Sequence, residues 1–353
     1  MRLRAILSGW CGVVLVCRVV PVYCQTQSEY PRTPWGGYPY PASYDAEVAD
    51  PDVHRVLFEN EKVMFLEVAN PPELDVKMHG HPYPSVFARD TGAGGPTVNG
   101  AARGAGVALD DTHLEPNSPF AGQGWGQGGP PAGLQFPRCT TAPPEGPHRP
   151  INHNAVPVHF YRIEFRRLDG DGLRAHWREW YPWMLKPARV VRNLKPGPAL
   201  GPNFSDQWPY SRLYDSVLAA PDNYRLLYED GHVRLLEVTV RPGEITPMHG
   251  HPYASVLAFD AVEADPREIV DTKLDPKSPL NGEKAGHGPA PSVFDMKSPT
   301  CETMGPQAPH AIRNNSDTPL HYYRIEFKRV DGDALGAHWQ EWYPWMKYME
   351  NMR

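Results

Sequence analysis

Short runs of apolar residues, several of them alternating with polar ones, recur along this 353-residue chain. Such runs bounded by Gly and Pro are typical of β-strands. They predict strands in pairs, at residues 63–68 and 233–240, 85–88 and 255–259, and 158–165 and 320–327. Many short strands joined by Gly- and Pro-rich turns favour a small β-barrel or sandwich.

The last pair of runs, VHFYRIEF and LHYYRIEF, has the clearest period of two. Alternation divides the first run into two faces, one with His159, Tyr161, Ile163 and Phe165 and the other with Phe160, Arg162 and Glu164. Arg162 and Glu164, like Arg324 and Glu326 in the second run, are interpreted as a structural ion pair. The alternative is that Glu164 or Glu326 faces a barrel interior.

Two aromatic segments, AHWREWYPWM at residues 175–184 and AHWQEWYPWM at residues 337–346, have Trp residues three apart and a Pro near the end. This spacing predicts a short amphipathic helix. We expect these segments to cap the barrels as core, and we expect His176 and His338 to have no chemical role.

The chain is a tandem duplication. MHGHPYPSV, starting at Met78, recurs as MHGHPYASV from Met248, an offset of 170. The 26 residues from 159 to 184 match residues 321–346 at 20 positions, an offset of 162. The predicted organisation is a leader (residues 1–24), an extended tail (25–44), a first domain (45–186), a linker (187–214) and a second domain (215–353). The large apolar end segments predict that the two domains stack as one pseudo-symmetric unit.

The first 24 residues have Arg2 and Arg4 before an apolar run that Arg18 interrupts. This pattern predicts a cleaved secretory signal rather than a membrane anchor, because the run is too short to span a bilayer. We therefore expect an exported protein, periplasmic or secreted, that starts near Gln25.

Composition narrows the choice of function. Pro and Gly together number 72, and the net charge is −6 with no cluster of Lys or Arg, which argues against a long helical bundle and against nucleic acid as a partner. Only Cys139 and Cys301 lie beyond the leader. We expect two buried free thiols, with pairing in an oxidising compartment as the alternative. Oligomerisation is left open.

Ten of the 15 histidines form five pairs related by the repeat. His79 and His81 are two residues apart, so on a strand both imidazoles point to the same side. His148 follows a Pro- and Gly-rich turn and lies four residues before Asn152, and His310 stands in the same relation to Asn314. Two imidazoles from one strand and a third from a distant turn are a plausible ligand set for one ion.

The pattern H-x-H followed later by P-H-x-x-x-N resembles the two motifs of the cupin superfamily, and both repeats carry it, so the mature chain resembles a bicupin. The resemblance implies an all-β fold of two tandem jelly-roll (RmlC-like) barrels, with the short aromatic helical segments at their ends. It also implies metal ligands in each barrel: His79, His81 and His148 in the first, and His249, His251 and His310 in the second.

The cupin motif also has a Glu four or five residues after the second His, where this chain has Ser85 and Val86, or Ser255 and Val256. The remaining three-His set is similar to that of cysteine dioxygenase and the diketone-cleaving dioxygenase. We expect a divalent metal in at least one barrel, its identity open among iron, zinc, copper, manganese and nickel. We also expect Ser85→Glu to be tolerated, because it would restore the carboxylate.

Four further residues are weaker candidates for the site. Tyr83 and Tyr253 either face the cavity or simply pack, and His159 and His321 either line the barrel, perform a supporting role behind a ligand, or are structural. Two functions compete. One is a metal-dependent enzyme, with oxidation by dioxygen favoured, acting on a small oxygenated or carboxylate-bearing molecule. The other is a non-catalytic exported protein that binds a sugar or another small molecule without metal.

Overall fold

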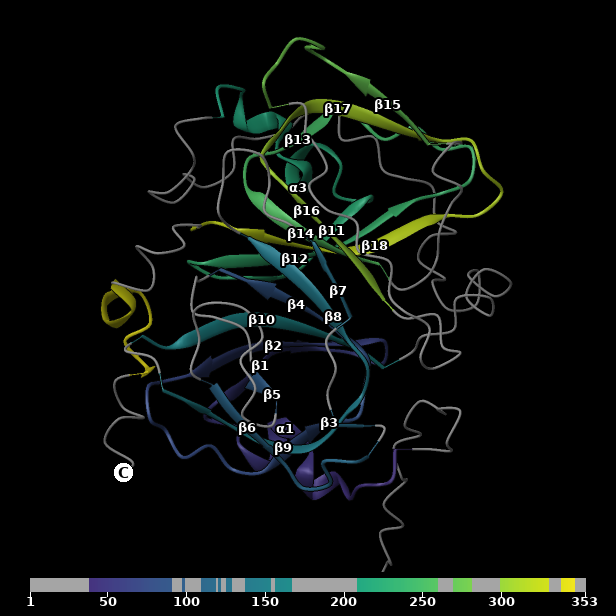
Figure 1. Ribbon diagram of the computed structural model, residues 1–353. Helices are drawn as coiled ribbons and strands as arrows, with labels where there is room; N and C mark the ends of the chain where they lie inside the picture. The colour runs from purple at the N-terminus through teal and green to yellow at the C-terminus, as the bar shows by residue number, and fades with distance from the viewer. Residues whose placement is uncertain are drawn as a thin grey trace, which may run out of the picture.

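The computed structural model describes residues 38–90, 97–98, 109–118, 120–121, 125–128, 137–153, 156–166, 208–259, 269–280, 299–329 and 338–346. Two β-structured halves, one from each copy of the repeat, are stacked on each other (Figure 1). The expected leader, the first part of the tail, most of the linker and the aromatic segment at residues 175–184 lie outside the described residues. Among those described, no helix is long and apolar enough to cross a membrane.

The first half has two sheets. The large one has the order β1–β2–β10–β4–β8–β7, and the small one the order β3–β9–β6–β5. The large sheet contains β1 (His54–Glu59), β2 (Val63–Asn70), β10 (Val158–Phe165), β4 (Ser85–Arg89), β8 (Arg138–Ala142) and β7 (Trp125–Gly128). The small sheet contains β3 (His79–His81), β9 (Glu145–Asn152), β6 (Leu109–His113) and β5 (Thr97–Val98). Neighbouring strands are antiparallel except for β5 and β6.

The second half repeats this plan, with a large sheet β11–β12–β18–β14–β16 and a small sheet β13–β17–β15. The strands are β11 (Tyr224–Glu229), β12 (Val233–Val240), β18 (Leu320–Phe327), β14 (Ala254–Phe259), β16 (Thr300–Met304), β13 (His249–His251), β17 (Gln307–Asn314) and β15 (Ile269–Lys273). A short 3-10 turn and a short helix precede each half, η1 (Ala42–Tyr44) with α1 (Ala46–Ala49) and η3 (Arg212–Tyr214) with α3 (Ser216–Ala219). The expected all-β fold of two tandem jelly-roll barrels is confirmed.

The large sheets of the two halves pack face to face. Their shared core contains Phe65, Ile163 and Phe165 from the first half and Leu235 and Ile325 from the second, all fully buried or nearly so. Period-two alternation explains this face, because in β10 the residues at odd positions point toward the other half. The predicted stacking of the two copies is confirmed, and the contact is made by the sheets themselves.

A disulfide joins the two halves through Cys139 of β8 and Cys301 of β16, whose Cα atoms lie 6.3 Å apart. The expectation of free thiols is therefore wrong. Both cysteines belong to the core between the large sheets. Sequence alone could not place them opposite each other, because their contact follows from the stacking of the two copies.

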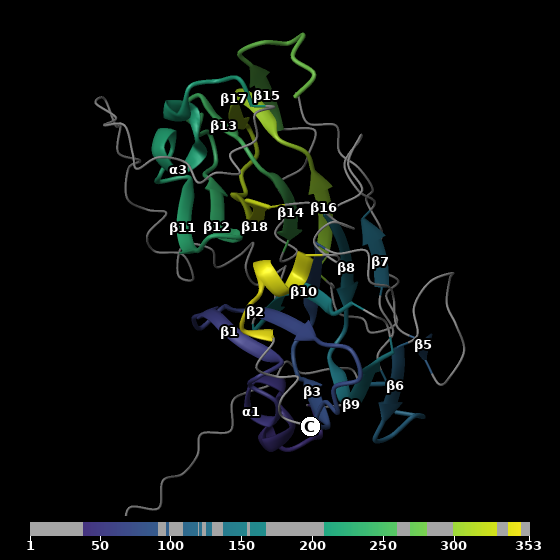
Figure 2. The same ribbon diagram turned by 90° about the vertical axis from the view of Figure 1, so that its left-hand side faces the viewer.

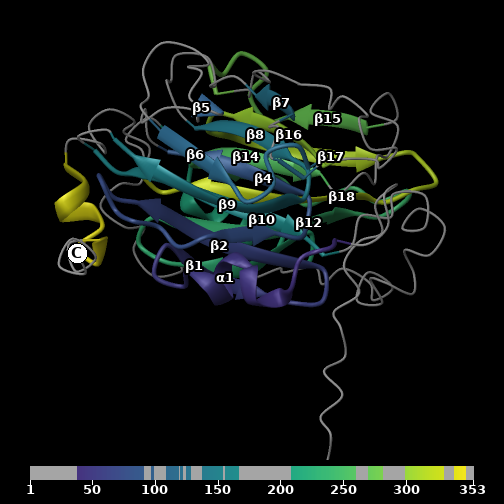
Figure 3. The same ribbon diagram turned by 60° about the horizontal axis from the view of Figure 1, so that its bottom comes forward.

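The described part of the last aromatic segment, residues 338–346, begins with a helical turn and packs on the first half (Figures 2 and 3). Trp339, Tyr343 and Met346 are buried with Ala69 of β2, and the Tyr343 hydroxyl donates a hydrogen bond to Asp90. As expected, this aromatic segment is packed as core, and His338 is exposed. The carboxyl-terminal segment of the second copy thus covers the first copy.

Candidate metal centre

The sequence His-Gly-His forms strand β3, which presents His79 and His81 to the space between the two sheets of the first half. Their ring centroids are 5.3 Å apart. The intervening Gly80 is required by close packing, because a Cβ atom there would lie 2.2 Å from the hydroxyl of Tyr38. In the second half Trp208 crowds Gly250 in the same way, at 2.8 Å.

The third predicted histidine of each half comes from the neighbouring strand. His148 of β9 is the register partner of His79, with ring centroids 4.7 Å apart, and His310 of β17 is the partner of His249, at 4.6 Å. In the second half, ligand nitrogens of His249, His251 and His310 all lie within 4.8 Å of one another. In the first half the ring centroids of the three predicted histidines lie 4.7 to 5.7 Å apart, but the ligand atoms of His148 group with those of His81 and Glu145.

Hydrogen bonds at Nδ1 fix the orientation of the imidazoles in the first half. His79 Nδ1 donates to the carbonyl of Lys77 at 2.8 Å, and His81 Nδ1 donates to Glu164 at 2.7 Å. His148 Nδ1 lies 3.0 Å from Asp111. An imidazole that donates through one nitrogen has its lone pair on the other, which is how metal-binding histidines are usually oriented.

The second half repeats this arrangement. His249 Nδ1 donates to the carbonyl of Pro247, His251 Nδ1 to Glu326, and His310 Nδ1 to the carbonyl of Ala308, at 2.8 to 2.9 Å. The Nε2 atoms of His148, His249 and His251 are buried and have no hydrogen-bond partner. His148 belongs to the first site and the other two histidines to the second, and buried imidazole nitrogen atoms without partners at each site fit a divalent metal ion.

The protonation states of most of these histidines also favour metal binding. Burial lowers the pKa of His79, His81, His249 and His251 well below the usual 6.5, so these rings are neutral and available as ligands. His148 differs. Burial alone would lower its pKa, but the carboxylate of Asp111 outweighs burial and raises it.

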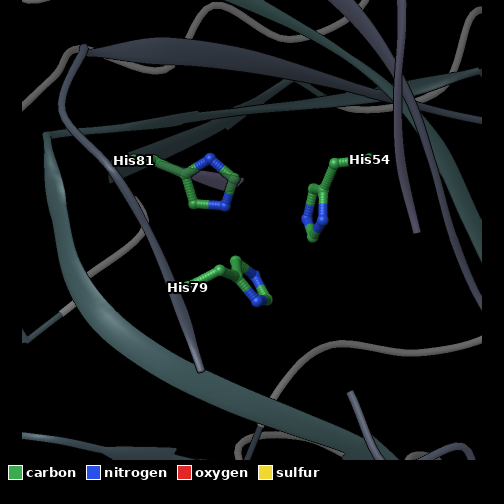
Figure 4. A group of neighbouring side chains, drawn as sticks. All are labelled: His54, His79 and His81. Atoms are coloured by element: carbon green, nitrogen blue, oxygen red, sulfur yellow. The ribbon is translucent and has the colours of Figure 1, made fainter. Parts of the chain in front are cut away.

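Sequence reasoning missed two residues of the first site. His54 of β1 has ligand nitrogens within 4.8 Å of those of His79 and His81, and Figure 4 shows the three rings turned toward a common centre. Glu145 of β9 forms a second such group with His81 and His148. His54 escaped notice because its counterpart in the repeat is Tyr224, and Glu145 because its counterpart is Gln307.

No family model matches the sequence, and no curated protein matches it. Solved structures similar to it include a cupin domain from Bordetella pertussis, 17% identical, covering 30% of this chain and 92% of that one with a TM-score of 0.21. Oxalate decarboxylase from Bacillus subtilis is 14% identical and covers 77% of this chain and 70% of that one, with a TM-score of 0.19. Salicylate 1,2-dioxygenase from Pseudoaminobacter salicylatoxidans, with gentisate bound, is 11% identical and covers 82% and 72%, with a TM-score of 0.20.

Two features of the chain itself decide the fold. The same arrangement of large and small sheets occurs twice, and each copy has a His-x-His strand paired with a third histidine between those sheets. The chain has the bicupin fold. The first site of this bicupin lies between β1, β3, β9 and β10, and the second between β11, β13, β17 and β18.

Acidic and basic side chains surround the first site of the bicupin. The Arg162 guanidinium forms ion pairs with Glu145 at 2.8 Å and with Glu164 at 3.1 Å. Burial raises the pKa of Glu164 to about 8 despite the opposing charge of Arg162. The expected ion pair of Arg162 and Glu164 is present, and Glu164 does face the barrel interior. It contacts the Nδ1 atom of His81, so it orients that ring from behind.

A small cluster behind His148 also has the composition of a ligand set. Ligand atoms of Asp111, His113 and His148 lie within 4.8 Å of one another, and the His113 ring stacks on that of His148 with centroids 5.6 Å apart. Burial alone would raise the pKa of Asp111, but the two histidines hold it well below its usual value. Asp111 is therefore a carboxylate that orients His148.

Two histidines and two tyrosines, the weaker candidates from the sequence, have the following contacts. His159 contacts Asp90 and Glu67 and stacks on Tyr343, and His321 contacts Glu237, on the faces of β10 and β18 opposite Arg162 and Arg324. They therefore lie on the faces that pack between the two halves, away from the faces that carry Glu164 and Glu326. Tyr83 and Tyr253 are buried, with the guanidinium groups of Arg166 and Arg234 over their rings at 6.0 and 5.0 Å.

Proposed function

We propose that this bicupin is an exported metalloprotein that oxidises a small oxygenated or carboxylate-bearing molecule with dioxygen. The observation that carries the proposal is the set of three oriented imidazoles that lie close together in each barrel: His79, His81 and His148 in the first, and His249, His251 and His310 in the second. A bound iron, copper, manganese, nickel or zinc ion would supply Lewis acidity, and iron or copper would also supply redox chemistry.

The buried arginines support an anionic substrate. Arg162 and Arg324 are nearly inaccessible to solvent, and the Nη2 atom of each is buried without a hydrogen-bond partner. A guanidinium with unused N–H groups is a geometrically suitable partner for a carboxylate. Their role in the reaction would be to bind and orient the substrate beside the imidazoles, while the surrounding apolar side chains of each barrel exclude water.

The disulfide between Cys139 and Cys301 supports export, because structural disulfides persist in oxidising compartments and are rare in the cytosol. An extracytoplasmic location agrees with the charged and apolar leader at residues 1–24. Mass spectrometry of the exported protein would test this part directly. We expect a mature chain beginning near Gln25, and an intact leader would contradict export by this route.

The deciding experiment is metal content. The full-length protein is expressed with iron, zinc, manganese, copper and nickel available, and metal per chain is measured by elemental analysis. We expect His79→Ala and His249→Ala each to reduce the metal bound by one barrel, while His338→Ala, at an exposed position, leaves the metal content unchanged. Circular dichroism of each variant controls for folding.

Oxygen consumption with aromatic and aliphatic carboxylic acids then tests the reaction class. A folded wild-type protein without metal would overturn the enzyme and favour a non-catalytic binding protein.

A further inference from the structure

The duplication allows the two sites to be compared position by position. The histidine sets are the same, but the side chains around them differ. At equivalent positions the first barrel has His54, Glu145 and Met64, and the second has Tyr224, Gln307 and Arg234. Each difference removes a metal-binding group from the second barrel or adds a positive charge to it.

His54 and Tyr224 occupy the same place. The His54 ring centroid is 4.2 Å from that of His79 and 5.3 Å from that of His81, and the Tyr224 ring is 4.3 and 5.0 Å from those of His249 and His251. His54 Nδ1 lies 3.3 Å from the carbonyl of Asp50, which leaves Nε2 to face the other imidazoles. A protonated phenol at this position is a much poorer ligand than an imidazole.

Glu145 and Gln307 also correspond, since each is the register partner of the second histidine in its barrel, His81 or His251. The Glu145 carboxylate has an oxygen within 4.8 Å of ligand nitrogens of His81 and His148. It supplies, from β9, the negative charge that the sequence lacks at Ser85. Gln307 offers only a neutral amide in the second barrel.

The buried charged side chains also make the second barrel less favourable to a cation than the first. In the first barrel a single arginine, Arg162, faces both Glu145 and Glu164. In the second barrel Arg234 pairs with Asp215 and Glu326, and Arg324 also pairs with Glu326. Glu326 thus contacts two guanidiniums, whereas its counterpart Glu164 contacts one, so the carboxylate behind the second histidine is less available to balance a divalent cation in the second barrel.

We propose that the two barrels have divided their tasks: the first offers a metal two further donors, His54 and Glu145, beside its three histidines, and the second, with three histidines alone, is the barrel whose metal leaves coordination positions open for a small anionic ligand. This inference rests on the proposed function, because it assumes that both barrels bind metal. In the second barrel, Arg324 contacts the Glu326 carboxylate behind His251 and has a buried Nη2 atom without a hydrogen-bond partner, so it is the candidate partner for the ligand's negative charge.

The two barrels provide matched variants for the test. In a His249→Ala background only the first barrel binds metal, and in a His79→Ala, His81→Ala background only the second does, because both histidines of β3 must be removed to disable the donor-rich first barrel. Exchanging the distinguishing residues gives His54→Tyr with Glu145→Gln in the first barrel, and Tyr224→His with Gln307→Glu in the second. The probe is Co²⁺, whose affinity is measured by equilibrium dialysis and whose coordination is followed by visible absorption, with azide as the small anionic ligand.

We expect the first barrel to bind Co²⁺ more tightly than the second, and we expect azide to change the absorption of the second-barrel site only. The exchange in the first barrel should weaken its affinity for Co²⁺ on the order of 10- to 100-fold and allow azide to bind there. The reciprocal exchange should raise the Co²⁺ affinity of the second barrel and prevent azide from binding.

If Glu145→Gln prevents folding, His54→Tyr alone tests the fourth imidazole. Equal affinities, or azide binding to both wild-type barrels, would overturn the division of tasks but leave the proposed function standing. Absence of Co²⁺ from both barrels of a folded protein would overturn both.

Discussion

The carboxylate of Glu164 accepts a hydrogen bond from Nδ1 of His81 at 2.7 Å, and the second barrel repeats this contact between Glu326 and His251 at 2.8 Å. Each carboxylate is buried and also faces an arginine, so its position behind the imidazole is fixed. Such a contact holds the ring in one tautomer and raises its basicity as a ligand.

Glu164→Gln should therefore weaken metal binding in the first barrel on the order of tenfold above about pH 8, the pKa of Glu164, because the amide keeps the size of the side chain but removes its charge. Equilibrium dialysis in the His249→Ala background measures the effect on this barrel alone. Glu341→Gln, at an exposed position, is the matched control. An unchanged affinity in the folded variant would show that Glu164 does not position His81.

Gly80→Ala should disturb the site through Tyr38. The new Cβ atom would lie 2.2 Å from the Tyr38 hydroxyl, which donates a hydrogen bond to the carbonyl of Glu145 at 2.8 Å. We expect a loss of about 1 to 3 kcal/mol in the free energy of unfolding, together with weaker metal binding. Thermal and urea unfolding measure the first effect.

Two further variants test the cause of that loss. Gly231→Ala should be nearly neutral, because no atom lies within 4 Å of its added Cβ. Adding Tyr38→Phe to Gly80→Ala removes the clashing oxygen and should restore part of the stability. If the double variant is no more stable than Gly80→Ala, the contact with Tyr38 is not the cause.

The disulfide predicts a response to reductant. Because Cys139 and Cys301 close a segment of 162 residues, their bond should stabilise the folded protein by about 2 to 4 kcal/mol. Reduction should lower the melting temperature of a protein that lacks residues 1–24 and their three cysteines, and its Cys139→Ala, Cys301→Ala variant should melt at the reduced temperature whether or not reductant is present. Titration of this shortened protein with a thiol reagent after denaturation should find no free thiol; finding two would contradict the bond.

The buried His159 predicts a pH dependence of stability. Burial alone would lower its pKa, but Asp90 and Glu67 outweigh it and raise the pKa from 6.5 to about 9. A pKa raised in the folded state contributes stability that is full below about 6.5 and is lost as the pH rises through about 9. The contribution is on the order of 3 kcal/mol, since one pKa unit corresponds to about 1.4 kcal/mol. Urea unfolding of wild type and His159→Gln should differ most near pH 6 and least above pH 9. A constant difference would contradict the ionic contact.

Ser85→Glu, which the motif alone predicts to be tolerated, should be destabilising. Ser85 is fully buried and is the register partner of Glu164, so a second carboxylate would lie beside the first without a free cation to balance it. We expect a loss of a few kcal/mol in urea unfolding. Ser85→Ala should cost little, because the Ser85 hydroxyl has no hydrogen-bond partner. A stable Ser85→Glu protein with tighter metal binding would restore the expectation from the motif.

Local pattern was sufficient for the strands and for the paired histidines. The runs at residues 158–165 and 320–327 are strands β10 and β18 with the predicted bounds, because alternation reflects the faces of a sheet directly. His54 and Glu145 could not be found in this way, since repetition was the guide and neither is repeated. The partner of Cys139 was also out of reach, because it depends on how whole sheets stack.

The disulfide also bears on how the chain arose. Cys139 and Cys301 are 162 residues apart, the same offset that relates His148 to His310, so each is the other's counterpart in the repeat. A position can touch its own counterpart only at a twofold axis, which makes the interface between the sheets isologous. The two barrels are therefore arranged as the subunits of a symmetric dimer would be. Because one polypeptide joins them, their pairing does not depend on protein concentration.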